Sequence, residues 1–487
     1  MRPLRVCLAA SEFAPFAKSG GLADVSSGLA AHLHRAGHDV RPFLPLYGRI
    51  HDARLDLHPV EFATDVPVKL GSWDFSFSLY SASVEPSGVS VYFVDCPHFY
   101  GRPGIYTSDP DEHLRFVFFS RAVLESCQRM GWSPHVLHVN DWQTALVPLF
   151  LKSVYSWDDL FRRSKTVLTI HNIGYQGGFS AEAVEDLHLG DRAPLLHQED
   201  FAGGVVNCLK TGILYADALT TVSETYAREI QTPEYGAGLD ALLRERRRSL
   251  FGIVNGVDYA EWSPETDPLI PHPYSANDLA GKERNKKALL EAMGLPYRKG
   301  APALGVVSRL TSQKGFDLLF DSLPELLGAA DVRFVALGDG EPKYVEFFRE
   351  VQRRYPRRAA FYHGYNNRLA HMIEAGADLF LMPSRYEPCG LNQMYSLRYG
   401  TPPVVRRTGG LADTVETFDP ATGRGTGFVF DHFTPDGLRW ALRHGLRTYG
   451  DPGAWRRLQK NAMAMNFSWE NQGARYVDLY RRLAGVP

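Results

Sequence analysis

The sequence predicts two α/β domains, each a parallel sheet with helices on both faces. A short glycine-containing word occurs twice, as Ser19–Val25 (SGGLADV) near the start and Thr408–Thr414 (TGGLADT) near the end. In both halves an apolar strand runs into a loop that opens a helix, as in a doubly wound sheet. A chain of 487 residues also exceeds one ordinary hydrophobic core, so two or three domains are expected.

Each glycine word has two interpretations. Glycine lets the backbone approach a ligand closely, and the free N–H groups in the first turn of a helix form an anion site. If the two halves face each other, a phosphate-bearing substrate would bind between them. The alternative is that Gly20-Gly21 and Gly409-Gly410 are only tight connections with positive φ angles.

Residues 4–45 form the first predicted unit. Leu4–Ala10 is an apolar run suited to a buried parallel strand, and Val40–Leu44 is the next strand. Between them, apolar residues recur at helical spacing until Gly37: Leu22, Val25, Leu29 and Leu33. This is a right-handed βαβ unit, whose ligands bind beyond the carboxyl ends of the strands. It has no G-x-G-x-x-G fingerprint, so a dinucleotide is not indicated.

Later strands of the first half end in polar residues. Val136–Val139 runs into Asn140-Asp141-Trp142, and Thr166–Ile170 runs into His171-Asn172. Strand ends are where a parallel sheet presents its chemistry, although a polar residue there is about as often a loop cap. A further strand, Ala218–Val222, is followed by Ser223 as a helix cap.

The second half repeats this design after a crossing segment and a short helix in residues 262–301. Ala303–Ser308 is a predicted strand, Arg309–Gly315 a basic loop, and Phe316–Leu327 a helix. Two cations beside a helix N-terminus would hold a diphosphate without a metal ion, whereas the alternative is a solvated surface pair. Further strands are predicted at 333–337 and 378–382. The chain ends in an amphipathic helix that Ser468 is expected to cap.

The composition narrows the class of protein. The formal net charge of −2 gives no reason to expect nucleic acid or an anionic membrane as partner. The 5 cysteines are scattered without a Cys-x-x-Cys pair, so we expect neither a zinc site nor a disulfide framework. The apolar run Val6–Ala10 is too short for a signal peptide, and no stretch is long enough to span a membrane. We therefore expect a cytoplasmic protein.

Seven motifs, in order along the chain, resemble those of bacterial glycogen synthases and plant starch synthases. They are Lys18–Val25, Asn140–Trp142, His171–Ile173, Asn255–Asp258, Ser308–Leu310 with Lys314-Gly315, Glu387–Leu391 and Arg406–Leu411. Any one of them alone would say little, but seven at consistent order and spacing make coincidence improbable. The resemblance runs from Lys18 to the end of the chain.

This resemblance implies two Rossmann-like domains that face each other across a deep cleft, the B-type glycosyltransferase fold. An N-terminal domain (1–257) would carry the glycine loop and the acceptor side, and a C-terminal domain (258–465) would bind the nucleotide-sugar donor. A helix within 466–487 would return to the first domain. The implied reaction transfers glucose from ADP-glucose to the non-reducing end of an α-1,4-glucan such as glycogen, with retention of configuration and without a cofactor or metal ion.

The family's functional residues carry over to this chain position by position. Catalytic roles fall on Asp141, His171, Arg309, Lys314 and Glu387. Donor contacts fall on Lys18, Gly20, Gly21, Asn255, Tyr365, Cys389, Thr408, Gly409 and Gly410. Asp24 and Tyr100 are placed on the acceptor or sugar side. In this scheme Arg309 and Lys314 stabilise the departing diphosphate, Glu387 faces the glucose hydroxyls, and Tyr365 is the aromatic partner of adenine.

The chain departs from the wider family at a few positions. Tyr395 stands where many B-type retaining transferases have a second glutamate, which leaves the ribose contact unassigned although synthases of the ADP-glucose type share this residue. Asn140 and Gln143 stand where many bacterial members have histidines, as in plant synthases. Ser19 replaces a commoner threonine, a change of little consequence if the backbone and Lys18 carry the function.

The chemistry can also be argued from the residues themselves. Breaking a sugar–diphosphate bond builds negative charge on the leaving phosphate, so the site needs fixed cations or dipoles there. The carboxylates do not identify a two-carboxylate pair, and the resemblance favours attack on the same face as the leaving group. A pyridoxal-phosphate-dependent phosphorolytic enzyme and a non-catalytic glucan-binding protein are the alternatives from other classes. A related transferase that uses UDP-glucose or another acceptor is the alternative within the transferases.

Overall fold

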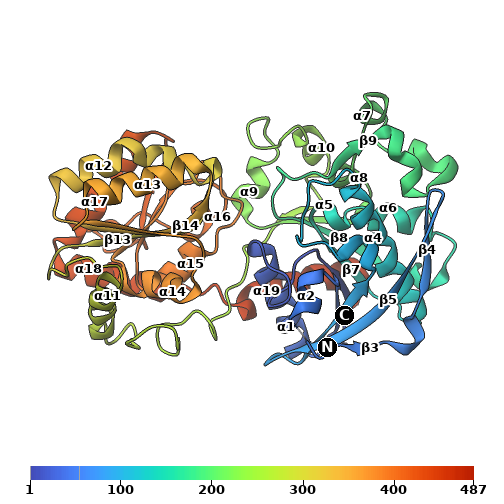
Figure 1. The fold of residues 1–487 in the computed structure, drawn as a ribbon, viewed down its shortest axis with the longest axis horizontal. Helices are drawn as coiled ribbons and strands as arrows, with labels where there is room; N and C mark the ends of the chain where they lie inside the picture. The colour runs from blue at the N-terminus through green and yellow to red at the C-terminus, as the bar shows by residue number, and fades with distance from the viewer. Residues whose placement is uncertain (1, 54, 487) are drawn as a thin grey trace. The chain divides into compact units, whose positions relative to one another are not determined.

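The computed structural model describes residues 2–53 and 55–486, which form two compact units (Figure 1). Unit 1 contains the residues up to Gly256 together with those from Trp469 onward, and unit 2 is Val257–Ser468. Each unit has its own sheet of mainly parallel strands, so the predicted α/β class is confirmed. Within the described residues, no helix is both long and apolar enough to cross a membrane.

The sheet of unit 1 has its strands in the order β12-β11-β8-β7-β1-β2-β6-β5-β3. Their bounds, in that order, are Leu250–Gly252, Ala218–Thr221, Lys165–Ile170, Val136–Asn140, Arg5–Ala9, Asp39–Pro45, Val89–Asp95, Trp73–Val84 and His58–Pro59. All neighbours from β12 to β6 are parallel. The long strand β5 is antiparallel to β6, β3 and β4 (Val66–Leu70), an extension that we did not predict.

The predicted first βαβ unit is confirmed. Strands β1 and β2 are parallel neighbours, and helix α1 (Gly21–Arg35) connects them. Its buried residues include Leu22, Val25, Leu29 and Leu33, the apolar stripe read from the sequence. Ser223 also caps a helix as expected, because its side chain accepts the N–H of Tyr226 in α9 (Glu224–Glu229).

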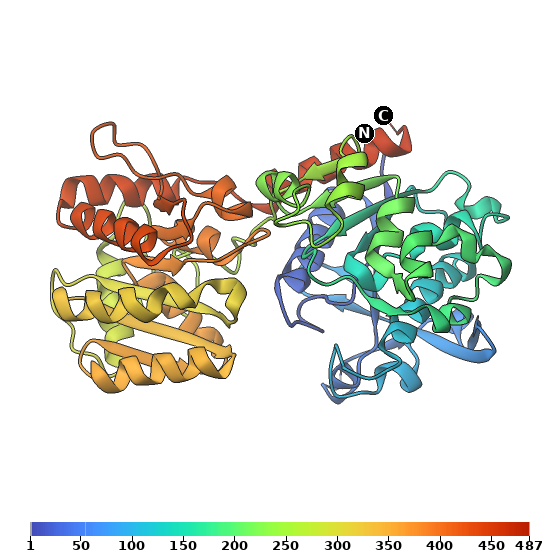
Figure 2. The ribbon, with the colours of Figure 1, turned by 90° about the horizontal axis from the view of Figure 1, so that it is seen from above.

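The last helix, α19 (Trp469–Ala484), belongs to unit 1 and packs against α1 (Figure 1). Its hydroxyl at Tyr480 lies 2.6 Å from Nδ1 of the buried His138 in β7. Near its end, Arg481 donates to the carbonyl of Arg2 at 3.1 Å. Figure 2 shows the last turns of α19 beside the start of the chain. The last helix of the chain therefore packs against the helix and strands that the start of the chain forms.

The sheet of unit 2 is entirely parallel, in the order β15-β14-β13-β16-β17-β18. The bounds are Ala359–His363, Arg333–Gly340, Ala303–Leu310, Leu379–Met382, Pro403–Arg406 and Phe428–Phe430. Apolar residues of α12, α13 and α17 form one core cluster with the sheet, which Trp455 and Leu458 of α18 join, and those of α11 and α14 form another on the opposite side (Figure 1). These helices are Leu319–Ala329, Pro342–Arg354, Pro435–Tyr449, Pro452–Met463, Ala280–Ala292 and Asn367–Gly376.

The basic loop of unit 2 differs from the prediction. Strand β13 continues through Leu310, so Arg309 is a strand residue rather than a loop residue. Lys314 ends a short 3₁₀ turn, and the α-helix α12 begins only at Leu319. Gly315 separates the two because its φ of 70° is left-handed and ends the first turn. Arg309 therefore lies in the strand rather than in the predicted loop, whereas Lys314 precedes a helical segment that begins at Phe316 and continues directly into α12.

The docking of α19 yields a stability prediction. A glycine-to-alanine change inside a helix usually stabilises by about 0.5–1 kcal/mol. At Gly28 in α1, however, a Cβ would lie 1.9 Å from Nε1 of Trp469. We expect Gly28→Ala to lower the free energy of unfolding of unit 1 by about 1–3 kcal/mol, as overpacked cores do. Urea-induced unfolding measures this change.

Gly328→Ala in α12 is the matched control, because its nearest neighbour to a new Cβ is Oη of Tyr355 at 4.0 Å. This variant is expected to stabilise unit 2. Stabilisation by Gly28→Ala as well would contradict the close packing of Trp469 on α1.

Candidate functional site

Both sheets reverse their strand order at a central strand. In unit 1, β1 lies between β2 and β7, and in unit 2, β13 lies between β14 and β16. Ligands of parallel α/β sheets bind beyond the carboxyl ends of the strands at such a reversal. Most of the predicted site residues follow β1, β7, β8, β13 or β16. Each unit therefore presents one group of candidate residues at this edge of its own sheet.

Hydrogen bonds join three strand ends in unit 1. Asn140 ends β7, and its Nδ2 donates to the carbonyl of Ala9 at the end of β1 (3.0 Å). Its Oδ1 therefore faces Nε2 of His171, which follows β8, at 2.9 Å. Because that oxygen can only accept, Nε2 carries the proton and Nδ1 keeps its lone pair. Asp141 Oδ1 accepts the backbone N–H of His171 at 2.7 Å.

Burial sets the charges of this group. Burial raises the pKa of Asp141 to about 7, against the opposing effect of its backbone hydrogen bonds. Burial lowers the pKa of His171 to about 3, so its imidazole is neutral near pH 7. Asp141 also has a left-handed φ of 53°, which is uncommon for a residue other than glycine. A neutral imidazole and a carboxyl that holds its proton near neutrality are suited to hydrogen-bonding sugar hydroxyls.

The first glycine word opens α1 as predicted, but two of its amides are already bonded. The N–H groups of Ser19 and Gly20 donate to Oε2 of Glu12, at 2.6 and 3.0 Å. The amide of Gly21, the first residue of α1, has no acceptor within the helix. Lys18 Nζ pairs with Asp24 Oδ1 at 2.7 Å. Burial raises the pKa of Asp24 although the charge of Lys18 opposes this effect.

The glycine at position 20 is not required by the packing of the protein. Its φ is −156°, which any residue adopts, and a Cβ there would meet no atom within 4 Å. The interpretation of this turn as a connection with positive φ is therefore wrong at Gly20. A glycine that the fold does not need fits a position where a ligand comes close to the backbone.

The remaining unit 1 candidates are buried. Tyr100 is 0% exposed, and its hydroxyl donates to the carbonyl of Arg115 at 2.8 Å. Asn255 is 5% exposed, and its Oδ1 accepts no hydrogen bond from the described residues. The side chain of Tyr100 thus has no exposed surface for a sugar, whereas Asn255 retains an unused acceptor.

In unit 2 a buried ion pair joins the two candidate loops. Lys314 Nζ lies 2.6 Å from Oε2 of Glu387, with side-chain exposures of 18% and 6%. Ser384 Oγ donates to the same oxygen at 3.0 Å. Arg309, in contrast, is exposed and forms no ion pair with any described residue. The site therefore contains one cation whose charge is balanced by a carboxylate and one cation whose charge is not.

The second glycine word packs against the segment that carries Glu387. Gly409 has a left-handed φ of 42°, and a Cβ there would lie 1.9 Å from the carbonyl oxygen of Glu387. A Cβ on Gly410 would lie 2.1 Å from that of Cys389. The N–H of Gly410 also donates to the carbonyls of Glu387 and Pro388, both at 3.1 Å. Here the glycines allow two backbone segments to touch, and Gly409 has the positive φ angle that the connection interpretation requires.

Other unit 2 candidates differ widely in exposure. Tyr365 is 80% exposed, and its hydroxyl lies 3.3 Å from Oδ1 of Asn367. Cys389 and Thr408 are buried, at 4% and 0% exposure. An exposed aromatic ring is available for stacking on a base, whereas the two buried side chains offer almost no surface to a ligand.

Sequence reasoning missed an aromatic stack around Tyr395. The Tyr395 ring is parallel to the ring of Trp262, with centroids 3.9 Å apart, and Trp262 also stacks on His371, with centroids 3.8 Å apart. His371 Nδ1 lies 2.8 Å from the buried Asp267. Trp262 comes from a segment that the sequence presented only as a crossing, so no motif signalled this contact. The residue in place of the family's second glutamate is thus part of a packed stack.

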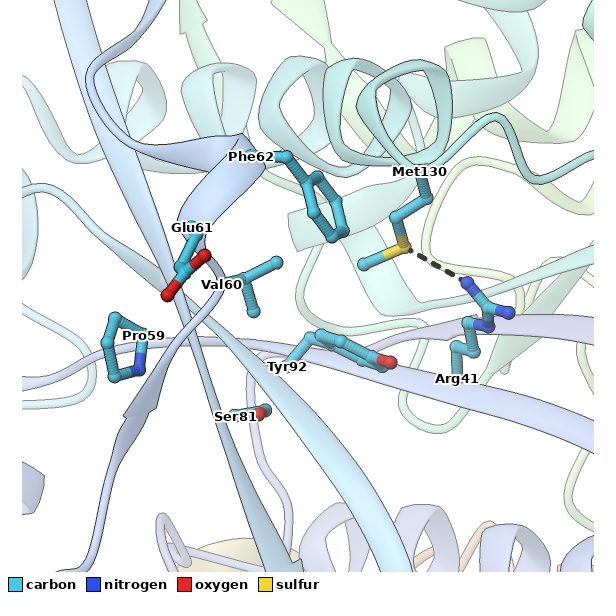
Figure 3. Close-up of a pocket in the computed structure, with 8 residues that line it drawn as sticks. All are labelled: Arg41, Pro59, Val60, Glu61, Phe62, Ser81, Tyr92 and Met130. Carbon is cyan, nitrogen blue, oxygen red and sulfur yellow. Dashed lines mark hydrogen bonds between the residues drawn. The ribbon is translucent and has the colours of Figure 1, made fainter.

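A separate recess of about 380 Å³ lies elsewhere in unit 1. Figure 3 shows its lining: Arg41, Pro59, Val60, Glu61, Phe62, Ser81, Tyr92 and Met130. None of these is a predicted site residue. In residues 2–53 and 55–486, no three His, Cys, Asp or Glu side chains are grouped so as to hold a metal ion.

Comparison with known protein families gives one match in the N-terminal part of the chain and one in the C-terminal part. Residues 5–245 match the family described as "Starch synthase catalytic domain", and residues 294–462 match "Glycosyl transferases group 1". A glycogen synthase of Desulforudis audaxviator is 45% identical over 99% of this chain and 96% of its own length. Glycogen synthase 1 of Geobacter metallireducens is 46% identical, with the same two coverages.

Solved structures give the same result. The catalytic domain of starch synthase IV from Arabidopsis thaliana, bound to ADP and acarbose, superposes with a TM-score of 0.90 at 34% identity, covering 99% of this chain and 100% of that one. A sucrose-phosphate synthase from Thermosynechococcus elongatus, at 18% identity and a TM-score of 0.61, shares the fold alone. The fold is thus the two-domain α/β fold of B-type glycosyltransferases, and the chain belongs to the glycogen synthase and starch synthase family of these enzymes.

Proposed function

We propose that this enzyme transfers glucose from ADP-glucose to the non-reducing end of an α-1,4-glucan, with retention of configuration. The observation that carries the proposal is the group Arg309, Lys314 and Glu387 at the strand-order reversal of unit 2. Family membership supports it, because relatives at 45–46% identity are glycogen synthases. The ADP in the related starch synthase IV structure supports an adenosine nucleotide as the leaving group.

The unit 2 residues have separate roles in this proposal. As the bond between C1 of glucose and the diphosphate breaks, negative charge develops on the phosphate, and preorganised cations lower the energy of that state. Arg309 supplies a guanidinium whose charge is unpaired in this structure. Lys314 supplies the second charge and aligns Glu387, whose Oε1 remains to accept a glucose hydroxyl. Tyr365 supplies an exposed ring for the adenine.

The unit 1 residues are proposed to act around the transferred glucose and the acceptor. Nδ1 of the neutral His171 accepts a hydroxyl, and Asn255 Oδ1 offers another acceptor. The Gly21 amide and Lys18 face the donor, with Asp24 holding Lys18 in place. The acceptor hydroxyl attacks C1 on the face that the phosphate leaves, and its proton passes to that phosphate. Tyr100 is proposed to support this group from within the core rather than to touch the sugar.

A direct assay tests the proposal. The enzyme is incubated with glycogen and either ADP-glucose or UDP-glucose, and the new linkage is identified by digestion with enzymes specific for α-1,4 bonds. We expect α-1,4 extension with ADP-glucose as the preferred donor, unchanged by excess EDTA because side-chain cations neutralise the diphosphate. Preference for UDP-glucose would contradict the donor assignment. Loss of activity in EDTA that Mg²⁺ restores would contradict the role of the cations.

The cations themselves form a second prediction. Arg309→Ala and Lys314→Ala are each expected to lower kcat by about 10²-fold, as the loss of one preorganised charge does. Arg309→Ala is the cleaner variant, because it breaks no ion pair in the described structure. Glu387→Gln is expected to lower kcat similarly while the melting temperature stays near that of the wild type.

Lys343→Ala is the control for these variants, since Lys343 is a half-exposed lysine of unit 2 that pairs with Asp317 at 3.2 Å. It is expected to leave kcat within about twofold, because an exposed ion pair contributes little. If Arg309→Ala behaved like Lys343→Ala, Arg309 would be an ordinary surface charge.

A further inference from the structure

Glu12 lies near the start of the loop between β1 and α1 and is not among the site residues predicted from the sequence. It is 4% exposed, yet four groups donate to its carboxylate. Oε2 accepts the N–H groups of Ser19 and Gly20 at 2.6 and 3.0 Å. Oε1 accepts the hydroxyls of Ser19 and Tyr106, both at 2.7 Å. A single buried carboxylate therefore holds two consecutive amides of the glycine loop.

The charge of Glu12 is stabilised by these bonds rather than by a cation. No lysine, arginine or histidine of the described residues forms an ion pair with it. A buried carboxylate without a counter-ion is costly unless donors surround it, and hydrogen bonds to a charged acceptor are about twice as strong as neutral ones. The glycine loop is thus fixed in the conformation that satisfies Glu12.

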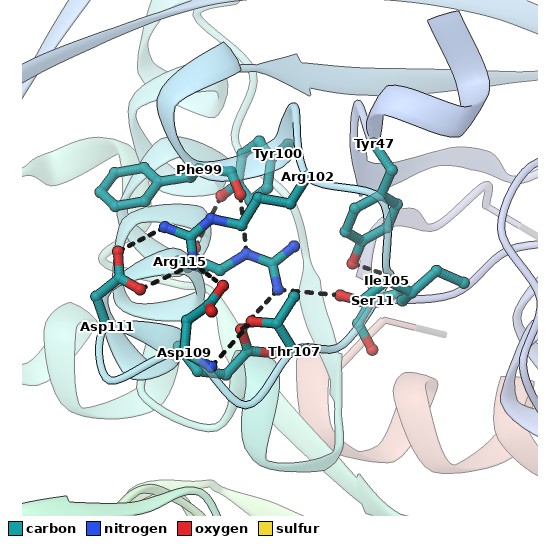
Figure 4. Close-up of polar contacts among 11 residues, drawn as sticks. Ser11, Tyr47, Phe99, Tyr100, Arg102, Ile105, Thr107, Asp109, Asp111 and Arg115 are labelled. Carbon is teal, nitrogen blue, oxygen red and sulfur yellow. Dashed lines mark hydrogen bonds and ion pairs between the residues drawn. The ribbon is translucent and has the colours of Figure 1, made fainter. Parts of the chain in front are cut away.

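Tyr106 connects this carboxylate to a second loop, residues 101–111, which other side chains also hold in place. Because Tyr106 donates to Glu12, Ser11 Oγ donates to Tyr106 Oη at 2.9 Å. The buried Arg115 donates to the carbonyls of Phe99 and Ile105 at 2.9 and 3.2 Å. Figure 4 shows Arg115 reaching into this loop.

Arg102 closes the same loop from its other end. It forms ion pairs with Asp109 and Asp111, at 2.8 and 2.5 Å (Figure 4). Thr107 Oγ1 donates to Glu112 at 2.6 Å. Tyr106, which donates to Oε1 of Glu12, therefore projects from a loop that several other side chains hold in place.

We propose that Glu12 is a positioning residue, held by Tyr106, that preorganises the glycine loop so that Lys18 and the Gly21 amide meet the donor. This rests on the proposed function of that loop. Glu12 touches no substrate in this scheme, because its oxygens are occupied by the loop itself. Its effect is to remove, before the donor binds, the conformational freedom of a loop whose Gly20 is otherwise unconstrained by packing.

Substitutions at and near Glu12 distinguish the effect of its hydrogen bonds from the effect of its charge. In Glu12→Gln, the amide oxygen can still accept both loop N–H groups, while its NH₂ faces two hydroxyls that can turn and accept. Glu12→Ala leaves all four donors without this partner. Tyr106→Phe removes only the link to the second loop. Thr107→Val is the matched control, because it removes one hydroxyl donating to a carboxylate in the same loop but away from Glu12.

The test measures initial rates against ADP-glucose and glycogen, together with backbone hydrogen exchange at Ser19 and Gly20. We expect Glu12→Ala to lower kcat/KM for ADP-glucose by about 10- to 100-fold, and Tyr106→Phe by about 3- to 10-fold, as misplacement of a binding group does. KM for glycogen should change by less than about twofold, and Glu12→Gln should recover most of the loss. Exchange at Ser19 and Gly20 should accelerate in Glu12→Ala and Tyr106→Phe but not in Thr107→Val.

Three results would overturn the proposal. One is wild-type kcat/KM and exchange in Tyr106→Phe and Glu12→Ala, and another is an equal loss in Thr107→Val. The third is a higher KM for glycogen while kcat/KM for ADP-glucose stays at the wild-type value. Exchange does not depend on catalysis, so an inactive wild type would contradict the proposed function while slow exchange at the two amides still supported the clamp.

Discussion

The structure depends on one topological constraint: each parallel sheet reverses its strand order at a central strand. At β1, and likewise at β13, the strand order reverses. The loops that follow the two strands on either side of the reversal therefore diverge, which leaves space at the strand ends where a ligand can reach the backbone. Residues far apart in sequence meet there, such as Asn140 with Ala9 and His171, or Lys314 with Glu387. These contacts follow from strand order rather than from sequence spacing.

The two glycine words have nearly the same sequence but different surroundings in the structure. Gly409 and Gly410 lie so close to the backbone of Glu387 and Cys389 that any side chain would collide with a carbonyl oxygen. That close approach fixes the segment carrying the carboxylate paired with Lys314. Gly20 has open space around it and an extended backbone, so the fold alone does not select glycine there. Under the proposed function, the bound donor rather than the fold limits the side chain at this position, and the buried carboxylate of Glu12 holds the loop where packing does not.

Much of the fold was predictable because buried parallel strands are apolar runs with clear ends. The strands β1, β2, β7 and β8 were placed to within about two residues, and so was α1. The antiparallel extension around β5 was missed although Trp73–Val84 alternates apolar and polar residues, the pattern of a half-exposed strand.

The site was predictable as a set of residues but not as a set of contacts. Motifs named Lys314 and Glu387, whereas their pairing depends on how far β13 extends and on the left-handed Gly315. The stack of Trp262 on Tyr395 and the clamp at Glu12 join segments with no common motif. Long-range side-chain contacts of this kind carry no periodic signal in one sequence.

The central claim is that the first glycine loop is shaped for a ligand, and Gly20→Ala tests it most directly. The measurement is kcat/KM for ADP-glucose, taken beside the melting temperature of the same preparation. The account predicts a melting temperature close to that of the wild type, because a Cβ at this position meets no atom within 4 Å, and a kcat/KM at least about 10-fold lower, because that Cβ would stand between the loop and the donor. A folded variant with wild-type kcat/KM would contradict the account.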